Sequence, residues 1–325
     1  GDSYQKISNL TYRKNGEVIK NNEKKVNLSS TFMCPDFSNL NLSDYFTNYK
    51  VSYGFHKSGI GSLPIFSSKG CEWRDKSKGG CVFCMIPHFG IRYKSPRQYW
   101  EEILFLKDKH GIETFWDVSD SFVDNLAWLE ELKKEKPKYL NVKLQVYGRP
   151  AKIDKKKVRL LKAIGVNEVF IGADSGDDYI LKIARKGFKT YHTINAINEL
   201  SKFDIDVVTS FVLGLPDETA STLENTVRFA KKLSNFNNVK ETSASILFPI
   251  PGSQVFSRML KLPHLSAKYS SDLYDREESK KDWIKYFTSV KKEELESALK
   301  RIRSYFELSN TFSESHNETY SSMDC

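Results

Sequence analysis

The feature that most constrains the fold is a regular alternation of strand-like and helix-like segments between residues 64 and 248. Short apolar or β-branched runs alternate there with stretches whose apolar residues recur at helical spacing. The expected strands are 64–67, 114–116, 142–146, 168–172, 206–213 and 243–248. The expected helices are 96–109, 126–133, 155–164, 179–184, 193–202 and 219–233. Connections of this length favour parallel strands joined by crossovers, so the sequence predicts an α/β fold, a partial (β/α)6 TIM-like barrel.

The regions before and after this alternation have different sequence patterns. Residues 1–63 predict an extended lead-in, in which Asn15-Gly16 between alternating residues indicates a β-hairpin. A short helix is expected around residues 42–47. Residues 64–255 form the expected barrel, and residues 256–325 are expected to form a helical extension, helical over 291–306, with a mobile tail.

Two local expectations concern helix ends. Gly165 directly follows the expected helix 155–164, where a glycine commonly ends a helix. Asp217 and Glu218 are expected in the first turn of helix 219–233, where negative charge suits the helix dipole.

Composition narrows the class of protein. Fifty Lys and Arg residues against 41 Asp and Glu give a net charge of +9, which we interpret as a solvated lysine-rich surface. The lysine clusters at 133–138 and 155–157 have no aromatic platform nearby, so a nucleic-acid partner is not expected. The sequence contains no membrane-spanning run and no signal-like N-terminus, so a cytoplasmic location is expected.

The five cysteines are an odd number and a poor disulfide framework. Three of them, Cys71, Cys81 and Cys84, fall within fourteen residues. The pair Cys81-x-x-Cys84 suits two thiolates on one metal centre, and a glycine-containing loop allows Cys71 to return as a third ligand. Two interpretations stay open: a closed zinc site with His88 as fourth ligand, or an iron–sulfur cluster with one open iron.

The cysteine segment resembles the signature of the radical S-adenosylmethionine (SAM) enzymes. That family places three cysteines after the first strand of a partial barrel, with an aromatic residue before the last one, a place that Phe83 fills here. The usual spacing is three residues and then two, whereas here it is nine and then two. Gly-Cys-x-Trp before a widened gap is similar to a subgroup that includes peptide-maturation enzymes.

Three later segments extend the resemblance, so that four ordered motifs cover about 185 residues. Residues 170–176, followed by Lys186-Gly187, are similar to the family's fourth-strand motif, with Asp174 where Glu is usual. Residues 212–219 resemble the fifth-strand exit, and residues 249–253 the segment after the sixth strand.

The lead-in adds a likeness of a different kind. Residues 10–13, 15–16 and 34–36 resemble the segment that follows a cobalamin-binding domain in the cobalamin-dependent branch of the family. Cobalamin is therefore a possible cofactor, although no domain that would bind it is expected within these residues.

The resemblance implies a mechanism. Cys71, Cys81 and Cys84 would hold a 4Fe–4S cluster whose open iron binds SAM. An electron from a reductase, flavodoxin or ferredoxin would then release a 5′-deoxyadenosyl radical that removes hydrogen from a peptide or small natural product. Phe83 would contact the adenine or simply pack in the core, and Arg149 would meet a carboxylate of the cofactor or substrate.

Four acidic or hydroxyl-bearing residues are expected near SAM. Asp117 or Asp120 would accept a hydrogen bond from its ammonium group, with a helix N-cap as the alternative for Asp120 and Ser121. Asp174 or Ser175 would bind the ribose or cap the next helix.

Two further positions complete the expected site. Residues Val212 to Gly214 would present backbone groups to the adenine, or would form only a strand-to-helix turn. Cys325 would return hydrogen to a substrate radical if the tail covers the barrel mouth.

Several functions fit these patterns. The first is a radical SAM enzyme that methylates, epimerises or crosslinks a peptide or natural product. A tRNA or protein methylthiotransferase is disfavoured because the sequence has no second cysteine set. A catalytically inactive relative, or a non-enzymatic zinc-stabilised binding module with a basic face, is the remaining alternative.

Overall fold

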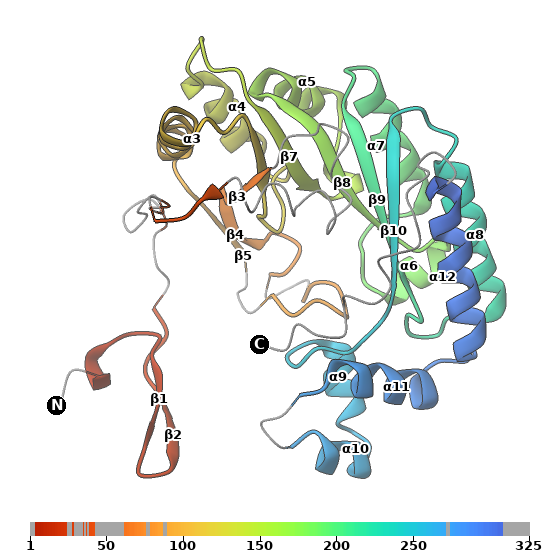
Figure 1. Ribbon diagram of the computed structural model, residues 1–325. Helices are drawn as coiled ribbons and strands as arrows, with labels where there is room; N and C mark the ends of the chain where they lie inside the picture. The colour runs from red at the N-terminus through yellow and green to blue at the C-terminus, as the bar shows by residue number, and fades with distance from the viewer. Residues whose placement is uncertain are drawn as a thin grey trace.

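The core of the molecule is one parallel sheet of six strands. The computed structural model describes residues 4–24, 28, 35, 37, 39–42, 62–75, 79–86, 90–270 and 274–307. The strand order is β10–β9–β8–β7–β6–β3, and each neighbouring pair is parallel (Figure 1). The strands are β3 (Leu63–Ile65), β6 (Thr114–Asp117), β7 (Lys143–Gly148), β8 (Val166–Asp174), β9 (Asp206–Leu213) and β10 (Val239–Ile246). Because the order ends at β3 and β10, the barrel is partial, as predicted.

A helix follows most of these strands, close to the position that the periodicity predicts. The helices are α3 (Pro96–His110), α4 (Leu126–Glu135), α5 (Lys155–Ile164), α6 (Asp178–Ile183), α7 (Thr190–Ser201) and α8 (Ala220–Leu233). Local chemistry sets their ends: Asp154 caps α5 by accepting from the Lys157 backbone N–H, and Gly165 ends it at φ 109°. The prediction for Gly165 is confirmed.

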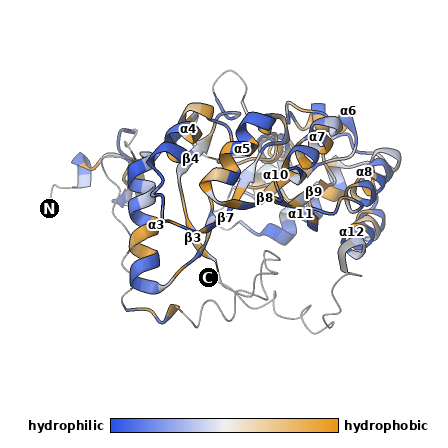
Figure 2. Ribbon diagram, turned by 90° about the horizontal axis from the view of Figure 1, so that it is seen from above, coloured by the Kyte–Doolittle hydropathy of each residue, from blue (hydrophilic) through white to orange (hydrophobic). Residues whose placement is uncertain are grey.

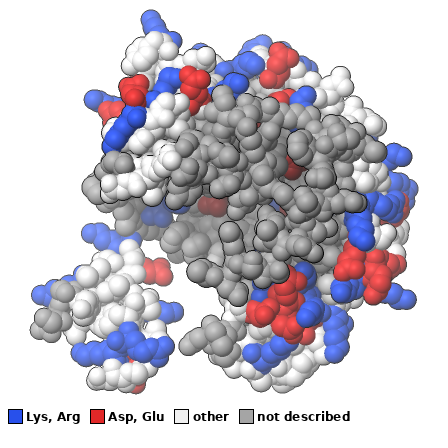
Figure 3. Space-filling view, viewed as in Figure 1, with Lys and Arg blue, Asp and Glu red and all other residues white. Residues whose placement is uncertain are grey.

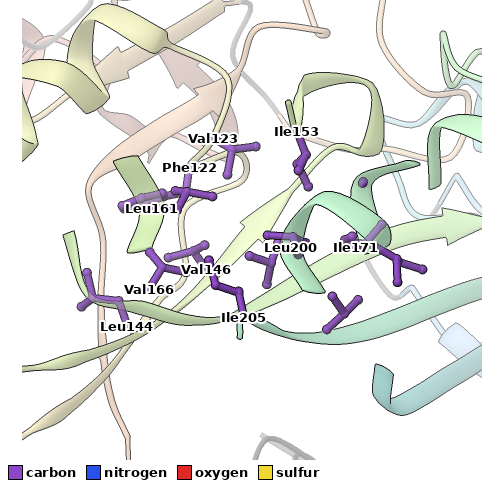
Figure 4. Packing of buried hydrophobic residues seen from close by; sticks show 14 of the residues in the cluster. Phe122, Val123, Leu144, Val146, Ile153, Leu161, Val166, Ile171, Leu200 and Ile205 are labelled. Atoms are coloured by element: carbon purple, nitrogen blue, oxygen red, sulfur yellow. The ribbon is translucent and has the colours of Figure 1, made fainter. Parts of the chain in front are cut away.

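The hydrophobic core lies between the outer face of the sheet and these helices. Leu144 and Val146 of β7 pack with Leu161 of α5 and Leu200 of α7, all fully or almost fully buried (Figure 4). The helices carry hydrophobic and hydrophilic residues on different sides (Figure 2), as helices over a buried sheet face do. Burial of one such side chain stabilises the fold by roughly 1.5–3 kcal/mol.

Among the described residues after β10, the structure has four helices, and the chain runs from β10 down to α9 in Figure 1. They are α9 (Gln254–Met259), α10 (Pro263–Lys268), α11 (Arg276–Phe287) and α12 (Lys292–Glu307). The helix predicted over 291–306 is confirmed, and its Leu295 and Ile302 belong to the main core. Trp283 of α11 packs in a second cluster together with Val82 from the cysteine segment. The C-terminal helices thus pack against the barrel and its mouth.

Two hairpins precede the first barrel helix. β1 (Thr11–Lys14) and β2 (Glu17–Lys20) pair around Asn15-Gly16, both at positive φ, which confirms the predicted hairpin. β4 (Ser68–Cys71) and β5 (Gly90–Tyr93) form a second antiparallel pair that the sequence did not predict. Two short 3₁₀ helices, η1 (Tyr4–Lys6) and η2 (Pro150–Lys152), complete the assignment.

Two predictions about helix starts are wrong. Asn125 caps α4 by accepting from the Trp128 backbone N–H at 3.0 Å, so Asp120 and Ser121 do not cap that helix. Thr219 caps α8, and Glu218 lies before the helix, fully buried, instead of in its first turn. The capping residue is the one whose side chain accepts a hydrogen bond from the N2 or N3 backbone N–H, and acidic residues further upstream do not reach these groups.

The surface agrees with the interpretation of the net charge. Acidic and basic side chains lie interspersed over the coloured part of the face in Figure 3. Lys268 of α10, for example, pairs with Glu278 at 3.0 Å and Asp282 at 2.8 Å on α11. Among the described residues, no helix is both long enough and apolar enough to cross a bilayer.

Candidate active site at the cysteine segment

The loop that leaves β6 holds the strand that carries Cys71. The Ser119 hydroxyl accepts hydrogen bonds from the backbone N–H groups of Ser67 and Ser68, at 2.8 and 2.9 Å. Asp120 Oδ2 accepts from the Gly70 N–H at 3.0 Å. These contacts fix β4 beside the carboxyl end of the sheet, where active sites of such barrels form. Cys71 is the last residue of β4.

The turn that carries Cys81 and Cys84 is held by two distant segments. The Val82 N–H donates to Ala184 O, just after α6, at 3.2 Å, and Val82 O accepts from the Val255 N–H of α9 at 3.1 Å. Gln254 donates to Gly79 O at 3.3 Å from the same side. The start of α9, directly after the motif at 249–253, therefore holds the cysteine turn in place.

Trp73 joins the cysteine segment to the loop that follows α6. Its Nε1 donates to Arg185 O at 2.6 Å, and Arg149 stacks over its ring at 4.5 Å. Gly187 lies directly against the ring, because a Cβ there would be only 2.2 Å from a Trp73 carbon. Arg149 also donates to Lys186 O at 2.8 Å. Trp73 was not predicted as a site residue, although it stands in the Gly-Cys-x-Trp motif.

The three sulfurs lie on two segments that Arg74 connects. Its N–H donates to Cys71 O at 3.1 Å, and its guanidinium donates to Cys84 O at 3.0 Å. Burial raises the pKa of the Cys71 and Cys84 thiols, and a Cys81 thiolate nearby raises that of Cys84 further. The described residues contain no group of three His, Cys, Asp or Glu side chains close enough together to hold a metal ion. His88, the proposed zinc ligand, lies outside the described residues.

Asp174 forms a buried ion pair beside this segment. Its carboxylate lies 2.6 Å from Lys186 Nζ, and its backbone adopts a positive φ of 58°. Burial lowers the pKa of Lys186, but the Asp174 carboxylate and a Cys81 thiolate raise it more, so Lys186 stays charged. Lys186 also lies 5.3 Å from the Phe83 ring, which packs half-buried in the second hydrophobic cluster. The core-packing alternative for Phe83 is thus confirmed, and its adenine contact stays a prediction.

Ser175 and Gly176 form the turn after β8. The Ser175 hydroxyl is within 3.1 Å of the Thr226 hydroxyl and accepts from the Asp177 N–H at 3.1 Å, so it supports the cap of α6. A Cβ at Gly176 would lie 2.4 Å from Phe229 Cβ, so only glycine lets this turn pack against α8. Ribose binding by Asp174 or Ser175 stays a prediction.

In the turn after β9, the backbone N–H and C=O of Gly214 both form hydrogen bonds within the protein. The Gly214 N–H donates to Glu218 Oε2 at 2.5 Å, and Gly214 O accepts from Trp283 Nε1 at 2.8 Å. Val212 pairs with Ser245 in the sheet. Burial raises the pKa of Glu218 to about 7. Adenine binding by Val212 and Gly214 stays a prediction, and both backbone groups of Gly214 already have partners.

The loop after β6 differs from these turns. Asp117 is fully buried and accepts from the Ser119 N–H at 2.9 Å, and burial raises its pKa. Asp120 is exposed, accepts from the Gly70 N–H next to Cys71, and acts electrostatically on Cys84. Asp124 was not predicted. It is 5% exposed, acts on Cys71, and neither carboxyl oxygen has a hydrogen-bond partner in the described part of the chain.

A family comparison decides the identity of this arrangement. The model of the radical SAM superfamily matches residues 65–230, just over half of the chain. The chain belongs to the radical SAM superfamily. Enzymes of this superfamily use a 4Fe–4S cluster and SAM, and they need an electron donor and a substrate.

Two of the curated relatives are named as methyltransferases. An uncharacterised methyltransferase of Pyrococcus horikoshii is 25% identical over 262 residues, which cover 79% of this chain and 52% of that protein. A cytidylyl-2-hydroxyethylphosphonate methyltransferase of Streptomyces wedmorensis is 23% identical and is matched over 42% of its length. The chain spans about half the length of these curated relatives.

Among solved structures, the fold is similar to cobalamin-dependent radical SAM enzymes. The methyltransferase TsrM of Kitasatospora setae, solved with tryptophan substrate and a SAM analogue, gives a TM-score of 0.63 at 17% identity, over 80% of this chain and 50% of that one. OxsB gives a TM-score of 0.61 at 16% identity, over 89% of this chain and 45% of that one. At these identities the likeness concerns the fold.

The donor set of the chain fits the family's cluster. Three thiols and no fourth cysteine in this segment would leave one iron open. The thiols must lose their protons when they bind iron. Because burial raises the pKa values of Cys71 and Cys84, the bound metal must favour their thiolate forms.

Proposed function

We propose that this chain is the catalytic core of a radical SAM methyltransferase that modifies carbon in a peptide or small natural product. The observation that carries the proposal is the anchoring of the Cys81–Cys84 turn by Ala184 and Val255, at the carboxyl end of a radical SAM barrel. Methyl transfer is favoured over epimerisation and crosslinking because two of the matched relatives are named as methyltransferases. A cytoplasmic location and a flavodoxin, ferredoxin or reductase as electron donor are part of the proposal.

In this proposal Cys71, Cys81 and Cys84 bind a 4Fe–4S cluster, and cobalamin, which the solved relatives bind, serves as methyl carrier. When bound, the cluster and SAM supply an electron and a 5′-deoxyadenosyl radical that removes hydrogen from the substrate. The protein contributes binding, orientation and exclusion of water.

The chain's own residues divide these tasks. Asp120, which already bonds the Gly70 N–H, accepts a hydrogen bond from the SAM ammonium group. The positive charge of Arg149 favours the Cys71 thiolate, and Lys186 places a second positive charge near Cys81. Trp73 holds both cations against the cysteine segment through Arg149 and the loop 185–187.

The decisive experiment is anaerobic reconstitution of the full chain with iron, sulfide and SAM, followed by reduction. We expect about four irons per chain, and release of methionine and 5′-deoxyadenosine. Cys71→Ala, Cys81→Ala and Cys84→Ala should each lose iron and SAM cleavage, whereas Cys34→Ala, outside the segment, should keep both. Added methylcobalamin should then be scored for binding and for methyl transfer.

Two results would contradict the proposal. The first is a colourless protein with one zinc, which would support the binding-module alternative. The second is a correctly loaded, reduced protein that does not cleave SAM, which would identify an inactive relative.

A further inference from the structure

The inner face of the sheet can be assigned from its register. Val146, Val169 and Ile171 lie in the core under the helices, so the residues that alternate with them face the barrel interior. Gln145 pairs with Glu168, and Tyr147 with Phe170, on that inner face. On β9 and β10 the inner positions include Asp206, Val208 and Glu241, since Asp206 is opposite Glu168 and Glu241 opposite Val208.

One wall of this interior is aromatic. The Tyr147 ring lies 6.0 Å from the Trp116 ring and 5.0 Å from the Phe170 ring, measured between centroids. All three side chains are half-buried. Burial raises the pKa of Tyr147 to about 12, so its phenol stays neutral. The negative faces of aromatic rings attract cations.

Three carboxyl groups lie at the amino-terminal side of this aromatic row. Glu168 is only 9% exposed, and its Oε1 is shielded and has no hydrogen-bond partner in the described part of the chain. Burial, together with Asp206 and Glu241, raises the pKa of Glu168 to about 8, and burial raises that of Glu241 to about 7. Asp206 pairs with Lys240 at 3.5 Å, whereas no cation of the described residues pairs with Glu168 or Glu241.

A buried carboxyl group without a partner is costly, so it either keeps a proton or receives a cation. The aromatic row and the two unpaired carboxyl groups favour the same kind of ligand. We propose that the barrel interior binds a positively charged nitrogen of the substrate, an amine or guanidine, between Glu168, Glu241 and the aromatic row. The inference rests on the proposed function and names its substrate class.

The position of this subsite also sets the shape of the substrate. Glu168 lies six residues before Asp174, whose partner Lys186 is beside Cys81. A strand rises about 3.3 Å per residue, so the carboxyl groups lie roughly 20 Å from the mouth. A substrate bound there and modified at the mouth is an extended molecule with its basic group at one end.

The test uses three probes of one shape and different charge: 4-phenylbutylamine, 4-phenylbutanol and 4-phenylbutyrate. Calorimetry on the full wild-type chain should give at least about tenfold tighter binding of the amine than of the alcohol, and no measurable binding of the acid. The double variant Glu168→Gln/Glu241→Gln should lose the preference for the amine and keep alcohol binding. Glu130→Gln, an exposed carboxyl on α4 that pairs with Lys156, is the matched control and should behave as wild type.

Equal affinity for amine and alcohol, no binding of any probe, or an unchanged amine preference in the double variant would each overturn the inference. If the double variant does not fold, Glu241→Gln alone is used, because Glu241 is the more exposed of the two. SAM cleavage without substrate, measured in the same proteins, separates the two proposals. A wild type that prefers the amine but cleaves no SAM refutes the proposed reaction, and one that cleaves SAM without that preference refutes only this subsite.

Discussion

The two halves of the barrel mouth differ in how their polar groups are satisfied. On the side of β8 and β9, Ser175 bonds Thr226 and the Asp177 N–H, Asp174 pairs with Lys186, and Gly214 is held by Glu218 and Trp283. On the side of β6 and β7, both oxygens of Asp124, the Ser121 hydroxyl and Arg149 Nε are shielded and have no hydrogen-bond partner among the described residues.

This difference separates scaffold from binding surface. On the β8–β9 side Glu218 Oε1 is also shielded and has no hydrogen-bond partner among the described residues, but the other groups named there are paired. A turn whose polar groups are mostly paired contributes rigidity and has few of them left to give to a ligand. Buried polar groups without partners cost stability, and proteins keep them mainly where a ligand, ion or water completes the set. The motifs after β8 and β9 therefore act first as structural turns, whereas the β6–β7 side beside Cys71 is the incomplete half.

The largest effect should come from Gly176 on the paired side. In Gly176→Ala the new Cβ meets Phe229 Cβ at 2.4 Å and Asn225 O at 2.6 Å, and neither is a flexible side-chain end. We expect a loss of more than about 3 kcal/mol in the free energy of unfolding. Urea denaturation measures it, with Gly111→Ala as the control.

Gly111 ends α3 at φ 69° with open space around it, so Gly111→Ala should cost only about 1 kcal/mol of backbone strain. Equal losses in the two variants would show that the β8 turn is not a tightly packed scaffold.

Glu218 should make the stability of the paired side depend on pH. Its pKa is 4.5 in the unfolded chain and about 7 in the fold, so its contribution is complete below pH 4.5 and is lost as the pH rises through 7. Glu218→Gln should therefore be more stable than wild type at pH 8 by up to about 3 kcal/mol, and should differ little at pH 4.5. Thermal unfolding across this range tests the sign, and a variant that is less stable at pH 8 would contradict it.

A substitution at Asp124 tests the β6–β7 side of the barrel mouth, where several buried polar groups lack hydrogen-bond partners among the described residues. Asp124→Asn removes the charge of a buried carboxylate without hydrogen-bond partners, so we expect the unloaded protein to gain about 1–2 kcal/mol. When iron, sulfide and SAM are added, the stability of this variant should rise less than the stability of wild type. Differential scanning calorimetry before and after loading measures both effects, with the exposed Asp108→Asn as control. A loss of stability in the unloaded Asp124 variant would mean that this carboxylate already has a stabilising role.

Trp73 bridges the two halves, and its polar contact should have the smallest effect. Trp73→Phe keeps a ring for Arg149 and Gly187 but loses the hydrogen bond to Arg185 O, which is worth about 1 kcal/mol. We expect a small fall in melting temperature and unchanged iron binding. Loss of iron in Trp73→Phe would show that this single hydrogen bond, not the stack, positions the cysteine segment.

The strands and helices of the barrel were predictable from the sequence because the spacing of apolar residues along the chain follows which side chains are buried. The strand over 206–213 and the helix over 155–164 have the predicted bounds, since their apolar residues face a continuous core. The β4–β5 pair was missed because the four residues Ser68–Cys71 carry no apolar alternation. Their pairing depends on a partner about twenty residues later and on Ser119, a contact that local patterns do not contain.

For the candidate site, the cysteine spacing predicts Cys71, Cys81 and Cys84 as cluster ligands, and this stays a prediction. The contacts of Trp73 with Arg185 and Gly187 join segments more than a hundred residues apart, and nothing local in the sequence encodes them. Glu218 illustrates the same limit: beside a helix start it suggested a dipole contact, but its carboxylate bonds Gly214 instead.

The clamp on the cysteine turn has a consequence for how the protein is made. Val82 is held by Val255, and Gly79 by Gln254, although about 175 residues are synthesised between them. While the chain grows on the ribosome, the sulfurs emerge long before the segment that immobilises their turn. Delivery of iron and sulfide by assembly factors would therefore be productive only after Gln254 and Val255 have also been translated.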